Sequence, residues 1–307
     1  MTEYDDPWKE VLDAYLKGFL ELCLPDIHNG IDWSSPIENH EQELPHLFPK
    51  SVTPGRVADK LFRAQFRGHA LPTWFLIHTE VQVTRQSDFA ERMFTCYYRI
   101  LDRFQEPVVC IGVLGDDSKS WRPSSWQVDT LGCKLHFSYP TVKLQDFANQ
   151  IEELKESTNP FATVIAAHLR AQGTSNSPDT RFRFKIELAR SLYEKLWPAD
   201  QVRSLFRFID WVMDLPVDFE LQFRYAVQQI EKEKNMPYVT SIERIAKGEG
   251  KAEGKAEGKA EGKAEGKIQL LQELLGLRVM TDDEFESMSP QQLAELLVSL
   301  RQQFDAR

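Results

Sequence analysis

The chain has 307 residues, of which 42% are hydrophobic, and its formal net charge is −10. This length can bury one substantial core with smaller helical parts, and the acidic balance argues against a protein that coats nucleic acid by bulk electrostatic attraction. No apolar run reaches the roughly eighteen residues that a membrane span needs, and residues 1–10 lack the features of a signal peptide, so we expect a cytoplasmic protein without a membrane partner.

The N-terminal region predicts one helix followed by an irregular connection. Asp5 and Asp6 precede Pro7 as helix-start signals, and apolar residues then recur at helical spacing. We expect this first helix to end near Leu24, before Pro25. Residues 25–55 contain five prolines among many polar residues, which indicates an irregular connection with room for one short strand.

The next region predicts a sheet with helices on it. Residues 56–66 and 72–83 are rich in aromatic and β-branched side chains and are separated by RGHAL, which is typical of a β-hairpin. Residues 87–104 begin with Ser87 as a helix cap and carry a helical stripe of apolar residues. PVVCIGVLG, residues 107–115, predicts a strand covered on both faces, and residues 132–144 predict another strand. This order implies a mixed sheet in an α/β core over residues 1–143.

The rest of the chain is predicted to be helical. Five helical patterns between residues 144 and 246 form an extension packed on the core. Residues 247–267 are a Gly-Lys-Ala-Glu repeat, in which each glycine costs about 0.8 to 1 kcal/mol relative to alanine, so a marginal helix or a flexible linker is expected. Residues 268–307 again show leucines at helical spacing and predict a small C-terminal helical domain.

Charge and cysteine content narrow the candidate chemistry. Residues 51–150 hold twelve basic and ten acidic side chains and form a net-basic block between two net-acidic ones, which weakly favours an anionic ligand there. The four cysteines are widely spaced without a CxxC pair, so the sequence supports neither a zinc site nor a disulfide framework.

The strand containing FLIHTEVQ carries the candidate catalytic residues. Alternation along a strand places His78, Glu80 and Gln82 on one face. Asp59 lies in the preceding strand, where a suitable hairpin register brings its carboxylate near that of Glu80. Two converging carboxylates repel each other unless a cation or a proton lies between them, and hard oxygen ligands favour Mg²⁺. His78 is interpreted as an ordinary strand histidine, because Mg²⁺ prefers oxygen.

These residues resemble a known signature. Asp59, a hairpin, and then Glu80-Val81-Gln82 at the end of an apolar strand are similar to the D…ExQ variant of the PD-(D/E)XK motif in the Rpn recombination-promoting nucleases, a family also described as transposases. The likeness extends to residues 87–104 and 107–115, to LFRFIDWVMDLP and to MPYVTSIERIAKG, and it covers most of residues 7–248. The tail resembles a small helical domain often appended to these proteins.

The resemblance implies a restriction-endonuclease-like core and a Mg²⁺-dependent DNA endonuclease, with Mn²⁺ as an alternative ion, that promotes recombination or transposition-like events. Asp59, Glu80 and the backbone carbonyl of Val81 would ligate the ion, and activated water would hydrolyse the phosphodiester. Gln82 stands where the commoner signature has lysine. Glutamine can orient water but supplies neither a positive charge nor a titrating base. DNA is the expected partner, and the sequence is compatible with a homo-oligomer.

Several alternatives remain at the level of the sequence. Three arginines, Arg92, Arg99 and Arg103, share one helix face, where they would either bind DNA phosphates or pair with neighbouring acids of the same helix. Glu10 of the first helix could reach the site, but its place opposite the apolar stripe favours a solvated position. The runner-up function is a catalytically weak or inactive nuclease-fold protein that binds DNA or a partner protein.

Overall fold

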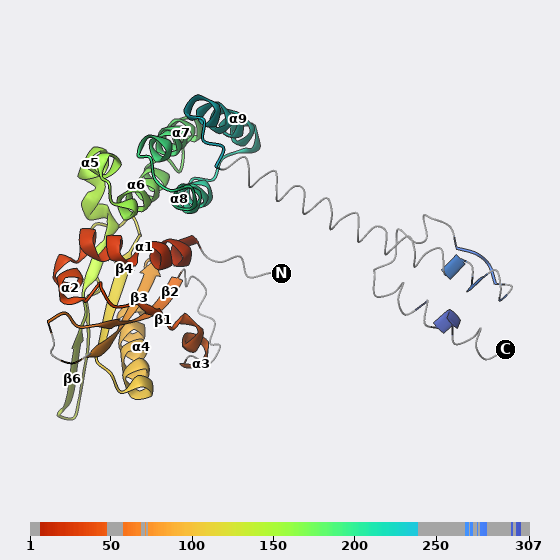
Figure 1. Cartoon of the computed structure of the whole chain (residues 1–307). Helices are drawn as coiled ribbons and strands as arrows, with labels where there is room; N and C mark the ends of the chain where they lie inside the picture. The colour runs from red at the N-terminus through yellow and green to blue at the C-terminus, as the bar shows by residue number, and fades with distance from the viewer. Residues whose placement is uncertain are drawn as a thin grey trace. The chain divides into compact units, whose positions relative to one another are not determined.

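The computed structural model describes residues 7–47, 58–68, 71, 73–238 and, within the C-terminal part, 268–269, 271–272, 275, 277–280, 296 and 299–301. The chain divides into two compact units, residues 1–238 and 239–307 (Figure 1). No helix in the described ranges is long and apolar enough to cross a bilayer.

A five-stranded mixed sheet forms the centre of the first unit. The order across the sheet is β1 (Glu38–Asn39), β2 (Ala58–Gln65), β3 (Trp74–Gln82), β4 (Val108–Leu114) and β7 (Thr141–Lys143). β2 is antiparallel to both β1 and β3, whereas β4 is parallel to β3 and β7 is parallel to β4. The α/β class expected from the sequence is therefore present, as a mixed sheet with helices on it.

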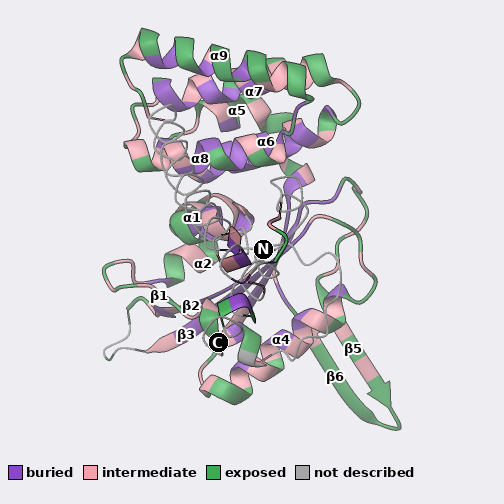
Figure 2. Cartoon of the chain, turned by 90° about the vertical axis from the view of Figure 1, so that its right-hand side faces the viewer, coloured by how far each residue is buried: buried purple, intermediate pink, exposed green. Residues whose placement is uncertain are grey.

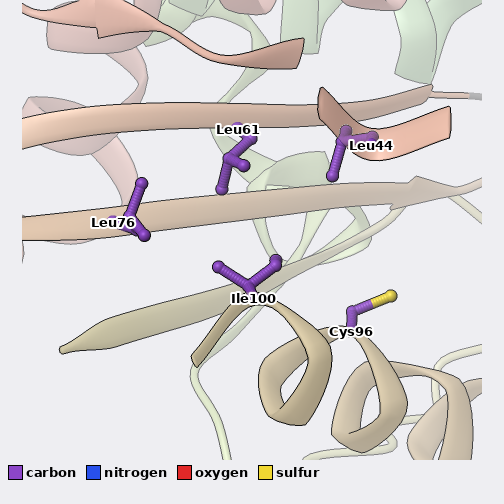
Figure 3. Packing of buried hydrophobic residues seen from close by; sticks show 5 residues of the cluster. All are labelled: Leu44, Leu61, Leu76, Cys96 and Ile100. Carbon is purple, nitrogen blue, oxygen red and sulfur yellow. The ribbon is translucent and has the colours of Figure 1, made fainter. Parts of the chain in front are cut away.

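Helices α1 (Pro7–Cys23) and α4 (Phe89–Phe104) cover opposite faces of this sheet. Leu61 of β2 packs with Leu76 of β3 and with Cys96 and Ile100 of α4, and Figure 3 shows the two α4 residues on the side of the helix that faces the strands. The adjacent residue Lys60 instead forms an ion pair with an aspartate of α1. Since neighbouring residues of a strand point to opposite faces, α1 and α4 lie on different sides.

The hairpin of β2 and β3, the helix α4 and the strand β4 agree with the sequence prediction, but two local details differ. Asp88, not Ser87, occupies the N-cap position of α4, and its side chain makes no capping hydrogen bond. The single strand predicted over residues 132–144 is divided into β6 (Cys133–Ser138) and β7. Pro140 lies between them, and proline has no N–H to continue a strand ladder.

Strand β6 pairs with β5 (Ser125–Thr130), a strand that was not predicted from the sequence. The two strands form a separate hairpin whose residues are mostly exposed and which projects from the sheet (Figure 2). Its tip contains Leu131 and Gly132, both with positive φ angles, of 50° and 88°. β5 does alternate polar and apolar residues, with Trp126 and Val128 half-buried on one face, so its strand signal was present in the sequence.

The connection after α1 is more helical than predicted. It contains α2 (Pro25–Gly30), the short β1, a 3₁₀ helix over Glu41–Glu43 and α3 (Leu44–Leu47). Pro25 is the first residue of α2, where the missing N–H of proline has no cost, so a proline there begins a helix and does not only interrupt one. Residues 48–57 lie outside the described residues.

The helical extension packs against α1. It comprises a 3₁₀ helix over Leu144–Gln150 and the helices α5 (Ile151–Glu156), α6 (Pro160–Gly173), α7 (Pro178–Glu194), α8 (Ala199–Val212) and α9 (Val217–Lys234). Trp8 of α1 contacts Phe208 of α8 and His168 of α6 edge to face. Phe19 of α1 packs on Phe161 of α6. The core and the extension therefore share one apolar interior.

The predicted repeat linker, residues 247–267, lies outside the described residues. In the C-terminal unit, Ile268, Leu275 and Leu300 are buried together. These three residues belong to the two leucine-rich stretches from which the sequence predicts helices.

A chain ending at Gly248 is expected to keep the cooperative thermal unfolding of residues 1–238. The reason is that the first unit contains its own buried core, whereas the repeat contributes almost no apolar surface. Circular dichroism of the truncated and full-length proteins measures this. A broad, non-cooperative transition in the truncated protein would show that the C-terminal part completes the core.

Candidate functional site

The candidate site is built on two adjacent strands. Asp59 of β2 and Glu80 of β3 are direct cross-strand partners in the observed register. Directly opposed residues point to the same face of a sheet, with Cβ atoms about 4.5 to 5.5 Å apart. Leu61, two residues after Asp59 on β2, and Leu76, four residues before Glu80 on β3, pack against α4. The two carboxylates therefore also lie on the α4 face. The same-face placement of these acids agrees with the alternation in the sequence.

Arg92 of α4 joins the site and binds both functional residues of β3. Its Nη2 forms an ion pair with Glu80 Oε1 and donates a hydrogen bond to Gln82 Oε1 at 2.9 Å. Its Nη1 bonds Gln86 and, at 3.4 Å, the Asp88 carboxylate. The Glu80 side chain is 1% exposed and that of Arg92 is 13% exposed. Arg92 thus neutralises a carboxylate that would otherwise be a buried charge.

The buried Glu80 carboxylate shifts the pKa values of two neighbouring groups. Burial by itself lowers the pKa of Arg92, but the Glu80 carboxylate outweighs it and raises the pKa, with smaller contributions from Asp88 and Asp59. Burial and the Glu80 charge raise the pKa of the Cys110 thiol on β4 as well. The guanidinium therefore stays charged, while the neighbouring thiol stays protonated in this form of the site.

The other two arginines of the predicted DNA-binding face have different surroundings. Arg99 donates a hydrogen bond to the backbone carbonyl of Leu47 at 2.9 Å, and Arg103, which is 62% exposed, lies 3.6 Å from a Glu43 carboxylate oxygen. Both attach α4 to the segment before β2. Contact of Arg92, Arg99 and Arg103 with DNA remains a prediction. The contacts of Arg92 with Glu80 and Gln82 were not predicted from the sequence.

A second set of potential ligands adjoins the carboxylates. Among the residues that the structure describes, one group of three histidine, cysteine or acidic side chains has all its ligand atoms within 4.8 Å of one another. The group comprises His78 and Glu80 of β3 and Cys96 of α4, and all three residues are buried. Strand alternation already places His78 beside Glu80, but only the packing of α4 on the sheet adds Cys96.

Glu10 does not belong to the site. Its carboxylate forms an ion pair with Arg207 of α8, on the side of the sheet that α1 covers. The pair is partly exposed, with side-chain exposure of 57% for Arg207 and 31% for Glu10, so Glu10 keeps contact with solvent as its place on the helix predicts. The spacing of residues within α1 contains no signal for a helix that begins at residue 199.

Oxygen donors for a hard divalent ion are present on the α4 face. Asp59 and Glu80 supply two carboxylates on neighbouring strands, a pairing that fits a divalent ion because the two negative charges repel each other without one. Val81 lies between Glu80 and Gln82 with Ala58 and Val113 as its strand partners. Arg92 already supplies one positive charge to Glu80, so an ion at this carboxylate would share it with the guanidinium.

Comparisons of the chain with protein-family models, with curated proteins and with solved structures found no match. The resemblance to the Rpn nucleases therefore depends on the residues quoted from the sequence.

Proposed function

We propose that the chain is a Mg²⁺-dependent DNA endonuclease with a core of the PD-(D/E)XK type. The observation that carries this proposal is the direct cross-strand pairing of Asp59 with Glu80, two residues before Gln82 on the same strand face. Through the family resemblance, the proposal extends to a role in recombination. The sheet supports it: an antiparallel β2-β3 pair with β1 at its edge is followed by the helix α4 and then by β4 parallel to β3.

Each side chain of the proposed site has a separate role in phosphodiester hydrolysis. A bound Mg²⁺ would supply Lewis acidity and a more acidic water molecule. Asp59 and Glu80 provide the negative charge that holds a cation, and the amide of Gln82 can orient water by hydrogen bonds. The Arg92 guanidinium bonds Gln82 and Glu80 directly, so it stands where it can provide the positive charge that a lysine at position 82 would have carried.

A second function is favoured by burial. Glu80 is 1% exposed and Gln82 is 0% exposed, and Arg92 is bonded to both. A scissile phosphate can therefore reach these groups only after Arg92 moves. This closed arrangement favours a nuclease-fold protein that binds DNA or a partner protein and cuts slowly or not at all.

Incubation of the purified full chain with supercoiled and linear DNA distinguishes the two functions. The proposed nuclease nicks or linearises the plasmid with Mg²⁺ or Mn²⁺ and loses this activity with chelator. Binding in a gel-shift assay without cleavage under either ion would replace the nuclease with the binding module.

Arg92 also determines how a lysine at position 82, as in the commoner signature, is expected to change the rate of cleavage. In Gln82→Lys, an ammonium group is placed beside the guanidinium, and two like charges in a buried site repel each other. We therefore expect the single variant to cut no faster than wild type. Adding Arg92→Gln removes the repulsion, so the double variant is expected to cut faster than either single variant. Faster cleavage by Gln82→Lys alone would show that Arg92 does not supply the charge.

A further inference from the structure

We propose that His78, Glu80 and Cys96 form a binding site for a transition-metal ion of the Zn²⁺ class, adjacent to the proposed Mg²⁺ site and sharing Glu80 with it. The binding itself does not depend on the proposed nuclease function.

The geometry is close to that of a metal centre. The three ligand atoms all lie within 4.8 Å of one another. A tetrahedral zinc ion with bonds of about 2.0 to 2.3 Å holds its ligand atoms roughly 3.3 to 3.7 Å apart. Small side-chain rotations therefore suffice to close the site. His78 and Glu80 are two residues apart on a central strand, and Cys96 lies on a helix packed against it, so regular elements hold all three.

The ligand types select the ion. Imidazole and thiolate suit Zn²⁺, Co²⁺ and related ions, whereas Mg²⁺ prefers an all-oxygen environment. Three protein ligands with a fourth position open are the usual pattern of catalytic zinc centres. The wide spacing of the cysteines argued against a zinc site in the sequence. A zinc centre with one cysteine needs no CxxC pair, so the wide spacing of the cysteines is compatible with this site.

Charge and surroundings also favour the ion. His78, Glu80 and Cys96 are 0 to 1% exposed, and Leu61, Leu76 and Ile100 form an apolar layer around Cys96. Binding releases the Cys96 proton to solvent, so the thiolate adds one negative charge, and the ion and Arg92 share the Glu80 carboxylate. Arg92 bonds Oε1 of Glu80, so an ion taken by Oε2 leaves that bond in place, and Arg92 then orients a metal ligand.

The shared carboxylate has a consequence if the proposed nuclease function holds. An ion on His78, Glu80 and Cys96 engages the carboxylate that the Mg²⁺ site needs. Zn²⁺ would then inhibit Mg²⁺-dependent cleavage at concentrations far below those of Mg²⁺.

Cobalt substitution tests the site without any assay of cleavage. The full chain is treated with chelator and reductant, and Co²⁺ is titrated while absorption is recorded. We expect one ion per chain, a thiolate-to-cobalt charge-transfer band in the near ultraviolet, and visible bands of tetrahedral intensity. Zn²⁺ should remove these bands by competition, and excess Mg²⁺ should not.

Variants assign the ligands. Cys96→Ser is expected to abolish the charge-transfer band, and His78→Gln to weaken Co²⁺ binding at least tenfold. Cys110→Ser is the matched control: Cys110 is buried on β4 directly opposite His78, but it lies outside the group of ligand atoms. Cys133→Ser, at an exposed position, controls for surface thiols. Circular dichroism verifies that each variant is folded.

The outcomes separate this site from the proposed nuclease. Asp59→Asn should leave the cobalt spectrum unchanged while removing Mg²⁺-dependent cleavage. A charge-transfer band that survives in folded Cys96→Ser, or that disappears in Cys110→Ser, overturns the assignment. If Cys96→Ser does not fold, an unchanged Co²⁺ affinity in His78→Gln overturns it equally. Absence of cleavage in wild type with an intact cobalt spectrum would reject the nuclease and keep the metal site.

Discussion

Replacing Asp59 or Glu80 by alanine is expected to lower Mg²⁺-dependent DNA cleavage by at least about 10²- to 10³-fold, the usual cost of removing electrostatic stabilisation at a reacting centre. The two carboxylates are cross-strand partners, so each is needed to hold the cation. Gln82→Ala should cost only about tenfold, because it removes an orienting hydrogen bond and leaves the charges in place. Rates of plasmid nicking at several Mg²⁺ concentrations measure this ranking.

A control for this ranking must separate the loss of the carboxylate charge from the loss of side-chain packing. Glu80 is buried and paired with Arg92, so its alanine variant leaves a cavity and removes the buried ion-pair partner of the guanidinium. Glu80→Gln and Asp59→Asn keep the shape of the side chains, and they should lose cleavage to a similar extent while remaining folded by circular dichroism. Cleavage that persists in both amide variants would place the chemistry at another site or in a contaminant.

Lys143→Met is expected to lower the free energy of unfolding by about 3 to 5 kcal/mol, because it leaves Asp116 as a buried charge without its ion-pair partner. Lys143 at the end of β7 pairs with Asp116 just after β4, and the two side chains are 1% and 3% exposed. Asp116 also accepts a hydrogen bond from the backbone N–H of Ser118 at 2.9 Å, which fixes its orientation. Urea denaturation of the wild type and the variant measures the difference.

Two further variants test whether the buried charge of Asp116 causes the loss of stability in Lys143→Met. Replacing both partners, in Lys143→Met with Asp116→Leu, should recover much of the stability, since an apolar pair avoids the desolvation of two charges. Lys134→Met removes an ion pair with Asp129 on the exposed β5–β6 hairpin, where side-chain exposure is 73% and 58%, and should change the stability little. A Lys143→Met effect as small as that of Lys134→Met would mean that water reaches the Asp116 carboxylate.

Local pattern in the sequence determined the parts of the site that lie within single elements. The two-residue period of β3 places His78, Glu80 and Gln82 on one face, and the apolar stripe of residues 87–104 predicts α4. The same period in the preceding strand restricts Asp59 to one face. The sequence left the hairpin register open, and the structure supplies it by pairing Asp59 directly with Glu80.

Only the tertiary structure decided how α4 meets the sheet. The rotation of α4 about its axis brings Arg92 to Glu80 and Cys96 to His78, and the spacing within the helix contains no record of which strand residues it faces. The partner of Glu10 depends in the same way on α8, nearly two hundred residues along the chain. Such contacts arise from packing between elements, whose geometry depends on all the side chains at the interface, whereas periodicity reports only the face that a single element buries.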